Sequence, residues 1–244
     1  MENKYIFGIR PLFEALESEV KIEKVLLRTN SDSPQINRLK DFLIKKDIPF
    51  QFVPVEKLNQ MTKGVHQGVA ALLPQLDYIE FEEMVENALK SEKNPIFILL
   101  DGVSDVRNLG AIARSAECTG VKGIVLPAKG GAAVNSDAVK SSSGALLRIP
   151  VAKVSNLRVA LYYLKESGFK IVAASEKSEN NIYSEDFKGA TAIIFGSEDK
   201  GISDSILTLA DSTVRIPMIG KVGSLNVSVA AGVVLFEAVR QRIS

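Results

Sequence analysis

The chain alternates short apolar runs, rich in β-branched residues, with amphipathic stretches whose apolar positions recur every three or four residues. In the first 75 residues, three of the apolar runs predict strands, at 22–27, 49–53 and 69–73. Two amphipathic stretches predict helices, at 8–18 and 33–47. The longer one begins with Ser33 and Pro34, an order typical of a helix start. This part of the chain therefore predicts a small α/β unit.

After Pro95 the same alternation continues with more strongly apolar runs, which predict strands at 96–101, 123–127, 170–175, 192–196 and 213–217. The stretches between and after them predict helices at 108–118, 156–167, about 203–210 and 226–242. Near-continuous apolar strands separated by helices are typical of a parallel sheet that is covered on both faces. The segment in front of this block, 76–93, carries two basic and six acidic residues. We therefore predict a first domain at 1–75, a linker and helix at 76–93, and a second domain at 94–244.

Composition excludes several kinds of chemistry. Cys118 is the only cysteine and His66 the only histidine, so an internal disulfide is impossible and a zinc site of the usual type is not expected. Catalysis by imidazole could use only His66. A net charge of +1 excludes a strongly basic nucleic-acid binder but leaves room for a local basic patch. Cys118, on a predicted helix, is expected to be a small buried residue.

The chain shows no targeting or membrane signal. No apolar run approaches the length of about 18 residues that a transmembrane helix needs. The first residues lack the pattern of charge, apolar block and small-residue cleavage site that marks a secretory signal. We therefore expect a cytoplasmic protein that does not enter a membrane.

Three loops that follow predicted strands, at 101–110, 195–203 and 216–232, carry the candidate chemistry, because ligands of open α/β sheets bind beyond the carboxyl ends of the strands. In the first loop, Asn108 is predicted to cap the following helix. The buried stripe of that helix is predicted to consist of Leu109, Ile112, Ala113 and Ala116. Arg114 falls on the opposite face, where it is either a solvated charge or a group reserved for chemistry.

The other two loops are rich in glycine, which lets backbone groups approach a ligand closely. The second loop fails the phosphate-binding pattern because Lys200 precedes its second glycine instead of following it. No G-x-G-x-x-G follows any predicted strand, so a dinucleotide site also lacks support. Together the loops predict a polar, backbone-lined pocket that includes Asn108, Arg114, Glu198, Ser224 and Asn226.

In this order the three loops resemble the three motifs of the SpoU/TrmH family, the RNA ribose 2′-O-methyltransferases of the knotted SPOUT superfamily. The segment "DVRNLGAIARSAECTG" resembles the first motif, with Val106 where many members have proline. "IIFGSEDKGIS" resembles the second and "IPMIGKVGSLNVSVAAGVVLFE" the third. The segments "YIFGIRPLFEAL", "IEKVLL" and "KGVHQGVAA" are similar to the ribosomal-protein-like RNA-binding domain of the branch that methylates a guanosine of 23S rRNA.

The resemblance implies an α/β fold whose C-terminal parallel-sheet domain contains a deep trefoil knot and follows a small α/β RNA-binding domain. It also implies S-adenosylmethionine as methyl donor, no metal, an RNA substrate and a homodimer. The implied catalytic residues are Asn108, Arg114, Glu198, Ser224 and Asn226. The implied cofactor-binding residues are Gly196, Gly201, Ile216, Met218, Gly220 and Leu225. The implied RNA-binding residues are Arg10, Lys63, His66 and Gln67.

Physical chemistry limits the role of Arg114. Proposals for the family make the matching arginine a general base, but a guanidinium is essentially always charged in proteins. We therefore favour a clamp that binds an RNA phosphate and stabilises the developing 2′-alkoxide. His66 lies in a turn before a strand, where binding or structure is favoured over catalysis. Three alternatives stay open: methylation of tRNA or another rRNA position, RNA binding without turnover, and a nucleotide-dependent enzyme.

Overall fold

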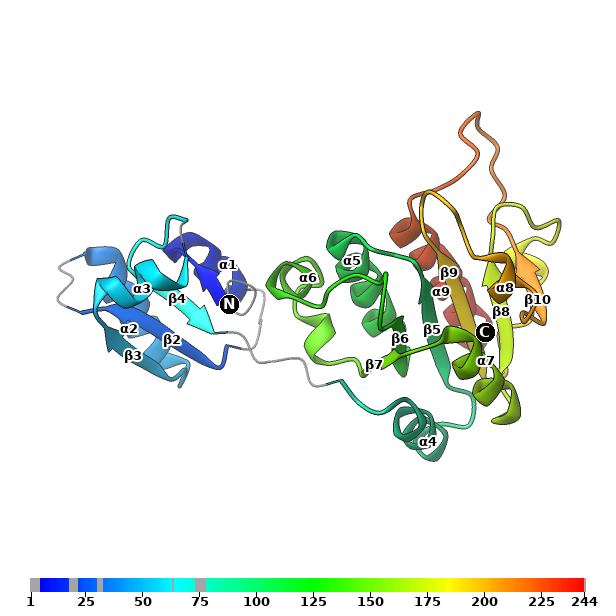
Figure 1. Cartoon of the computed structure of the whole chain (residues 1–244), viewed down its shortest axis with the longest axis horizontal. Helices are drawn as coiled ribbons and strands as arrows, with labels where there is room; N and C mark the ends of the chain where they lie inside the picture. Colours follow the sequence, from blue (N-terminus) through cyan, green and yellow to red (C-terminus); the bar gives the residue numbers. More distant parts are fainter. Residues whose placement is uncertain (1–4, 18–21, 30–32, 63, 73–77, 244) are drawn as a thin grey trace.

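The computed structural model describes residues 5–17, 22–29, 33–62, 64–72 and 78–243. In these ranges the chain forms two separate β-sheets, each built from its own part of the sequence (Figure 1). Lys63, one of the predicted RNA contacts, lies outside the described residues.

The first sheet has four strands in the order β1-β4-β2-β3. Its strands are β1 (Tyr5–Phe7), β2 (Lys24–Arg28), β3 (Phe50–Val53) and β4 (Val69–Leu72). β2 and β3 are parallel, whereas β4 runs antiparallel to both β1 and β2. Its helices are α1 (Ile9–Glu17), α2 (Pro34–Lys45) and α3 (Val55–Met61). The predicted strands and helices of this part are present, and the pattern missed only β1 and α3, which are too short to show a period.

The second sheet has six parallel strands in the order β10-β8-β9-β5-β6-β7. Its strands are β5 (Ile96–Asp101), β6 (Gly123–Pro127), β7 (Val151–Val154), β8 (Lys170–Ala174), β9 (Thr191–Gly196) and β10 (Ser212–Val214). The helices of this part are α4 (Phe81–Ser91), α5 (Val106–Cys118), α6 (Ser136–Ser141), α7 (Leu157–Glu166), α8 (Asp204–Leu207) and α9 (Val227–Ile243). Two short 3-10 turns are η2 (Ala145–Leu147) and η3 (Ile182–Ser184).

Alternate residues of the central strand β5 face two different cores. Ile98 and Leu100 pack with the apolar residues of α5 and α9, whereas Phe97 and Leu99 pack with those of α4 and α7. This confirms the predicted α/β fold with a parallel sheet covered on both faces, behind a smaller α/β domain. The knot stays a prediction. Within the described part of the chain, no helix is both long and apolar enough to cross a membrane.

The start of α5 differs from the prediction. The helix begins at Val106, and the N-cap is Asp105, whose side chain accepts a hydrogen bond of 2.7 Å from the backbone N–H of Arg107. Asn108 therefore lies inside the first turn, and its side chain is released from capping. The predicted buried stripe of α5 is confirmed, because Leu109, Ile112, Ala113 and Ala116 are fully buried. Cys118 is exposed, contrary to the prediction, because α5 ends there.

Two helical glycines test how closely the helices of this domain pack. A Cβ atom at Gly110 of α5 would lie 1.9 Å from Ser141 Oγ and 2.8 Å from the backbone oxygen of Ala138 in α6. Gly110→Ala is therefore expected to lower the free energy of unfolding by about 1–3 kcal/mol, although alanine favours the helix. A Cβ at Gly232 of α9 would have its nearest neighbour at 3.6 Å, so Gly232→Ala is the matched control. Urea unfolding of both variants checks this, and equal stabilities would contradict it.

Helix α9 is fastened at its carboxyl end. Arg242 donates hydrogen bonds of 2.7–2.9 Å to three backbone oxygens, those of Asn94, Phe187 and Gly189. One turn earlier, Glu237 is buried, and hydrogen bonds from Arg240 lower its pKa below the ordinary value. The last turn of the helix is therefore held against the segments that precede β5 and β9.

Candidate functional site

A cavity of about 430 Å³ lies at the carboxyl ends of β8, β9 and β10 and at the start of α9; we call it the first cavity. Its volume is in the range of small-molecule sites. Eight of the predicted site residues line it: Gly196, Glu198, Gly201, Ile216, Met218, Ser224, Leu225 and Asn226. The structure thus brings together residues from two loops that are well separated in sequence.

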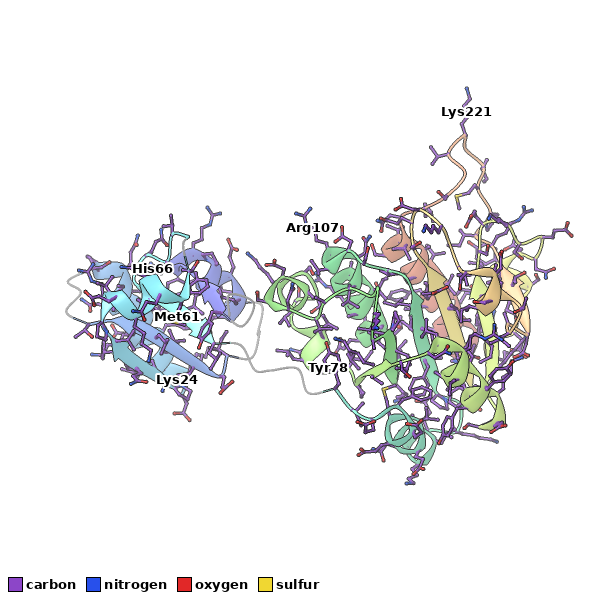
Figure 2. The ribbon with its side chains drawn as sticks, viewed as in Figure 1. Lys24, Met61, His66, Tyr78, Arg107 and Lys221 are labelled. Carbon is purple, nitrogen blue, oxygen red and sulfur yellow. The ribbon has the colours of Figure 1, made fainter. Side chains whose placement is uncertain are left out.

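Gly220 is not among the residues that line the first cavity. It lies in the projecting loop between β10 and α9, beside Lys221, which Figure 2 shows at the tip of this loop, directed away from the sheets. The loop is exposed from Pro217 to Asn226, so its apolar side chains Ile219 and Val222 face solvent.

A tight turn after β9 forms one wall of the first cavity. Ser197 and Gly201 are joined by two backbone hydrogen bonds of 2.8 and 3.1 Å, and Gly201 has a positive φ of 68°. A Cβ atom at Gly196 would lie 2.1–2.4 Å from the backbone of Gly201 and Ile202. The chain can fold back on the strand only because residue 196 has no side chain. We call residues 197–201 the Glu198 turn.

Asn226 links the three loops through side-chain hydrogen bonds. Its Nδ2 group donates to Asn108 Oδ1 over 3.1 Å and to Glu198 Oε1. Its Oδ1 accepts from the backbone N–H of Ser228 over 2.9 Å, which caps α9 as predicted. Because a carboxylate only accepts hydrogen bonds, Glu198 fixes which way the Asn226 amide points. Asn108 is in turn oriented with its oxygen toward Asn226.

A second cavity of about 310 Å³ adjoins the first. The two share the residues Ser197, Glu198, Asp199, Lys200 and Val227. The second cavity is also lined by Asn108 and by the loop from Gly102 to Asp105. The Glu198 turn therefore borders both cavities, so molecules bound in the two would lie next to each other.

Arg114 lies apart from the other predicted catalytic residues. It is exposed on α5, two turns beyond Asn108, and lines neither cavity. Among the described residues, its side chain has no hydrogen bond and no ion pair. The prediction that Arg114 faces away from the buried stripe of its helix is thus confirmed, and its side chain is free to bind a group outside its own chain.

The predicted RNA contacts that the structure describes lie on two segments of the first domain, Arg10 on α1 and His66 and Gln67 in the turn before β4. Arg10 is exposed and pairs with Glu14 over 3.2 Å. Gln67 Oε1 accepts a hydrogen bond from the backbone N–H of Ile9 over 3.0 Å. His66 Nδ1 accepts from the N–H of Gly68 over 2.9 Å, so its Nε2 carries the proton and donates to Asn59 over 2.8 Å. The bond between Gln67 and Ile9 thus ties the turn that contains His66, labelled in Figure 2, to the start of α1, where Arg10 follows Ile9 in the sequence.

Sequence reasoning missed one wall of the first cavity. Ser175, Glu176 and Lys177, which follow β8, line it together with Arg215 after β10. The rule that ligands bind beyond the carboxyl ends of strands could have found them, because β8 was predicted. Their loop has no glycine, so it lacks the signal that marks the other two loops. Among the described residues, no group of three His, Cys, Asp or Glu side chains could hold a metal ion.

Comparison with known proteins gives matches over nearly the whole chain. The model of the SpoU rRNA Methylase family matches residues 95–236, and a model described as RNA 2′-O ribose methyltransferase substrate binding matches residues 5–79. YacO of Bacillus subtilis, whose name assigns it to the TrmH family of tRNA/rRNA methyltransferases, is 34% identical over 241 residues. The match covers 99% of this chain and 97% of YacO.

Two solved structures are similar. The SpoU methyltransferase AviRb from Streptomyces viridochromogenes, in complex with its cofactor AdoMet, superposes with a TM-score of 0.72 at 25% identity, over 98% of this chain and 90% of AviRb. The TrmH/SpoU tRNA modifying enzyme of A. aeolicus has a TM-score of 0.57 at 32% identity, over 67% of this chain and 84% of that enzyme.

Proposed function

Because this chain belongs to the SpoU rRNA methylase family, we propose that it methylates the ribose 2′-hydroxyl of a guanosine in 23S ribosomal RNA. As a member of this family, the chain is an RNA 2′-O-ribose methyltransferase that uses S-adenosylmethionine. The choice of a 23S guanosine rests on the resemblance of the first 75 residues to one branch of the family. The observation that supports the reaction best is the Asn226 link, which joins all three loops between two adjoining cavities.

The first cavity fits the methyl donor. Gly196 and Gly201 both line it, and the absence of a side chain at Gly196 lets the Glu198 turn fold against the strand to form one wall. In our proposal the backbone at Gly196, Ile216 and Leu225 holds the adenine and ribose, Gly201 and Met218 complete the wall, and Gly220 acts only through the loop that carries Met218. S-adenosylmethionine, when bound, supplies an electrophilic methyl group on a sulfonium. The protein then has to orient the acceptor hydroxyl and help remove its proton.

We assign that orienting role to the groups around Asn226. Asn226 holds Glu198 and Asn108 in fixed positions, and Ser224 precedes it by two residues in the same loop. Asn108 has its amide nitrogen available, because among the described residues only its oxygen is bonded. In our proposal this nitrogen binds the ribose from the second cavity, and the Ser224 hydroxyl contacts it from the first.

Arg114 acts as a clamp in this scheme. Its charged guanidinium binds a phosphate beside the target nucleotide and stabilises the 2′-oxygen as it loses its proton. The proton passes to a phosphate oxygen or to water. Since Arg114 lines neither cavity of its own chain, we propose that it acts on the site of a second copy.

The surface of α9 supports a homodimer. Val229, Phe236 and Ile243 recur every seven residues on this helix and are 51–80% exposed. The opposite side of α9, at Ala231, Val234, Leu235 and Ala238, is fully buried in its own chain. Apart from Arg240, the exposed face of α9 is apolar, and burial against another copy would remove it from water. α5 packs on α9, with Ser115 beside Gly232, so a second copy on α9 would meet Arg114 of α5.

We further propose that residues 1–75 deliver the RNA. Arg10, Lys63, His66 and Gln67 would contact it, with His66 and Gln67 acting through the turn that they hold. Residues 76–93 form the linker and first helix in front of the methyltransferase domain, 94–244. Recognition of RNA loops by a separate domain suits a target that must be unstacked before its ribose can enter the second cavity.

The test is to map 2′-O-methyl groups in 23S rRNA and tRNA from cells with and without the gene. We expect one guanosine of 23S rRNA to lose its methyl group, and the purified protein to restore it with S-adenosylmethionine. Complementation with Asn226→Ala, which removes the Asn226 link, is expected to leave the site unmethylated. If the methyl group is lost from tRNA or from another position in rRNA, the proposed substrate is wrong and the proposed reaction stands. An unchanged map would overturn the proposal.

A further inference from the structure

Asp101, at the carboxyl end of the central strand β5, has a bonding pattern that the reaction described above does not use. Its Oδ2 atom accepts two hydrogen bonds of 2.8 Å from one residue, Ser203: one from the backbone N–H and one from the hydroxyl. The two residues are 102 positions apart. Ser203 occupies the N-cap position of α8, but its hydroxyl makes no capping bond and turns to Asp101 instead.

The chain between Gly196 and Ser203 contains the Glu198 turn. Gly196 is the register partner of Asp101 on the neighbouring strand, so both ends of this segment start from the same place on the sheet. The start of the segment, at Gly196, is fixed because β9 pairs with β5, and the turn after it is closed by the hydrogen bonds between Ser197 and Gly201. Asp101 fixes the exit by holding Ser203.

Glu198 lies within this segment, between its two restrained ends. Its carboxylate receives the amide of Asn226, which also holds Asn108. A shift of the exit by a fraction of a hydrogen-bond length would move Glu198 relative to α9, because the turn has only five residues, Ser197 to Gly201. The position of the catalytic amides is therefore tied, through Glu198, to the exit of the turn.

We propose that Asp101 is a positioning residue that sets the Glu198 turn, and through it the Asn226 link, by accepting both hydrogen bonds of Ser203. The expected effect of Asp101 on kcat rests on the proposed function, whereas its effect on the position of the turn does not. Asp101 lines neither cavity, so in this proposal it contacts neither the methyl donor nor the RNA ribose. What the position requires is an oxygen acceptor; a negative charge is not needed. Asparagine can supply that oxygen, whereas alanine cannot.

The experiment compares Asp101→Ala, Asp101→Asn and Ser203→Ala in the full-length protein. Loss of both hydrogen bonds to Ser203 in Asp101→Ala is expected to misplace the Glu198 turn. We expect kcat to fall by about 100-fold, with little change in KM for RNA. Asp101→Asn is expected to restore most of kcat. Ser203→Ala keeps the N–H bond and is expected to lose about tenfold or less. The control is Asn156→Ala, which removes the side-chain N-cap bond of α7 and none of the hydrogen bonds of Asp101 or Ser203.

Amide hydrogen exchange gives a readout that does not depend on activity. We expect faster exchange at residues 197 and 201 in Asp101→Ala, and unchanged exchange there in Asp101→Asn and Asn156→Ala. If Asp101→Ala keeps normal kcat and slow exchange, or if Asp101→Asn is as impaired as Asp101→Ala, the proposal is overturned. If Asp101→Ala does not fold, Asp101→Asn and Ser203→Ala decide alone. A wild-type protein without methyl transfer would refute the proposed function, and the exchange result would still test the Asp101 restraint.

Discussion

A heterodimer of one Arg114→Ala subunit and one Asn226→Ala subunit is expected to recover about half of the wild-type turnover, although each variant alone is nearly inactive. Arg114 lines neither cavity of its own chain, and the exposed apolar face of α9 predicts a second copy beside α5. In the heterodimer, the intact Arg114 reaches the pocket that still has Asn226. The other pocket lacks both groups.

Co-expression with two affinity tags isolates the heterodimer, and methyl transfer to rRNA measures its turnover. If Arg114 acts within its own chain, the heterodimer stays inactive, because each chain then lacks one essential group. Arg114→Lys on both subunits separates charge from shape: donor binding should persist while most turnover is lost, since lysine cannot grip a phosphate with two parallel N–H groups. Near-normal turnover of this variant would contradict the clamp.

Gly196→Ala is expected to weaken S-adenosylmethionine binding by about 100-fold, the equivalent of about 3 kcal/mol. The new methyl group would overlap backbone atoms of Gly201 and Ile202 at 2.1–2.4 Å, and backbone cannot rotate away as a side chain can. The Glu198 turn must therefore move, and with it one wall of the first cavity. Calorimetric titration with S-adenosylmethionine measures the loss.

Gly189→Ala is the control for that prediction. Gly189 lies before β9, has no neighbour within 4 Å of a Cβ position and has no positive φ. Its substitution should leave donor affinity unchanged. Equal affinities of Gly196→Ala and the wild-type protein would show that the Glu198 turn does not contribute to the donor site.

Much of the fold could be predicted because its signals are local. The apolar runs of β5 and β6 are continuous, and the structure has both strands at the predicted residues. The stripe of α5 follows the helical period, which placed Arg114 on the outer face. Short elements escaped for the same reason: β7 has four residues and α6 has six, too few for a period to emerge.

The contacts of the site could not be predicted from local pattern. Asn226 and Asn108 are 118 positions apart, and Asp101 and Ser203 are 102 apart. Each of these residues looks like an ordinary turn or cap residue in its own segment. The start of α5 shows why local pattern is not enough. Asp105 and Asn108 are both residue types that favour an N-cap, and only the structure shows that Asp105 is the cap. Family resemblance supplied the grouping of the loops, and the fold supplies the bonds that join them.

Helix α9 is anchored at both ends, by Asn226 at the carboxyl ends of the strands and by Arg242 at the segments that precede β5 and β9. Its 17 residues span about 25 Å, so it connects the two ends of the sheet as a rigid element. Trimming the final residues of the polypeptide would release the far anchor and loosen the near one. We therefore expect methyl transfer to depend on Arg242, although this residue lines neither cavity.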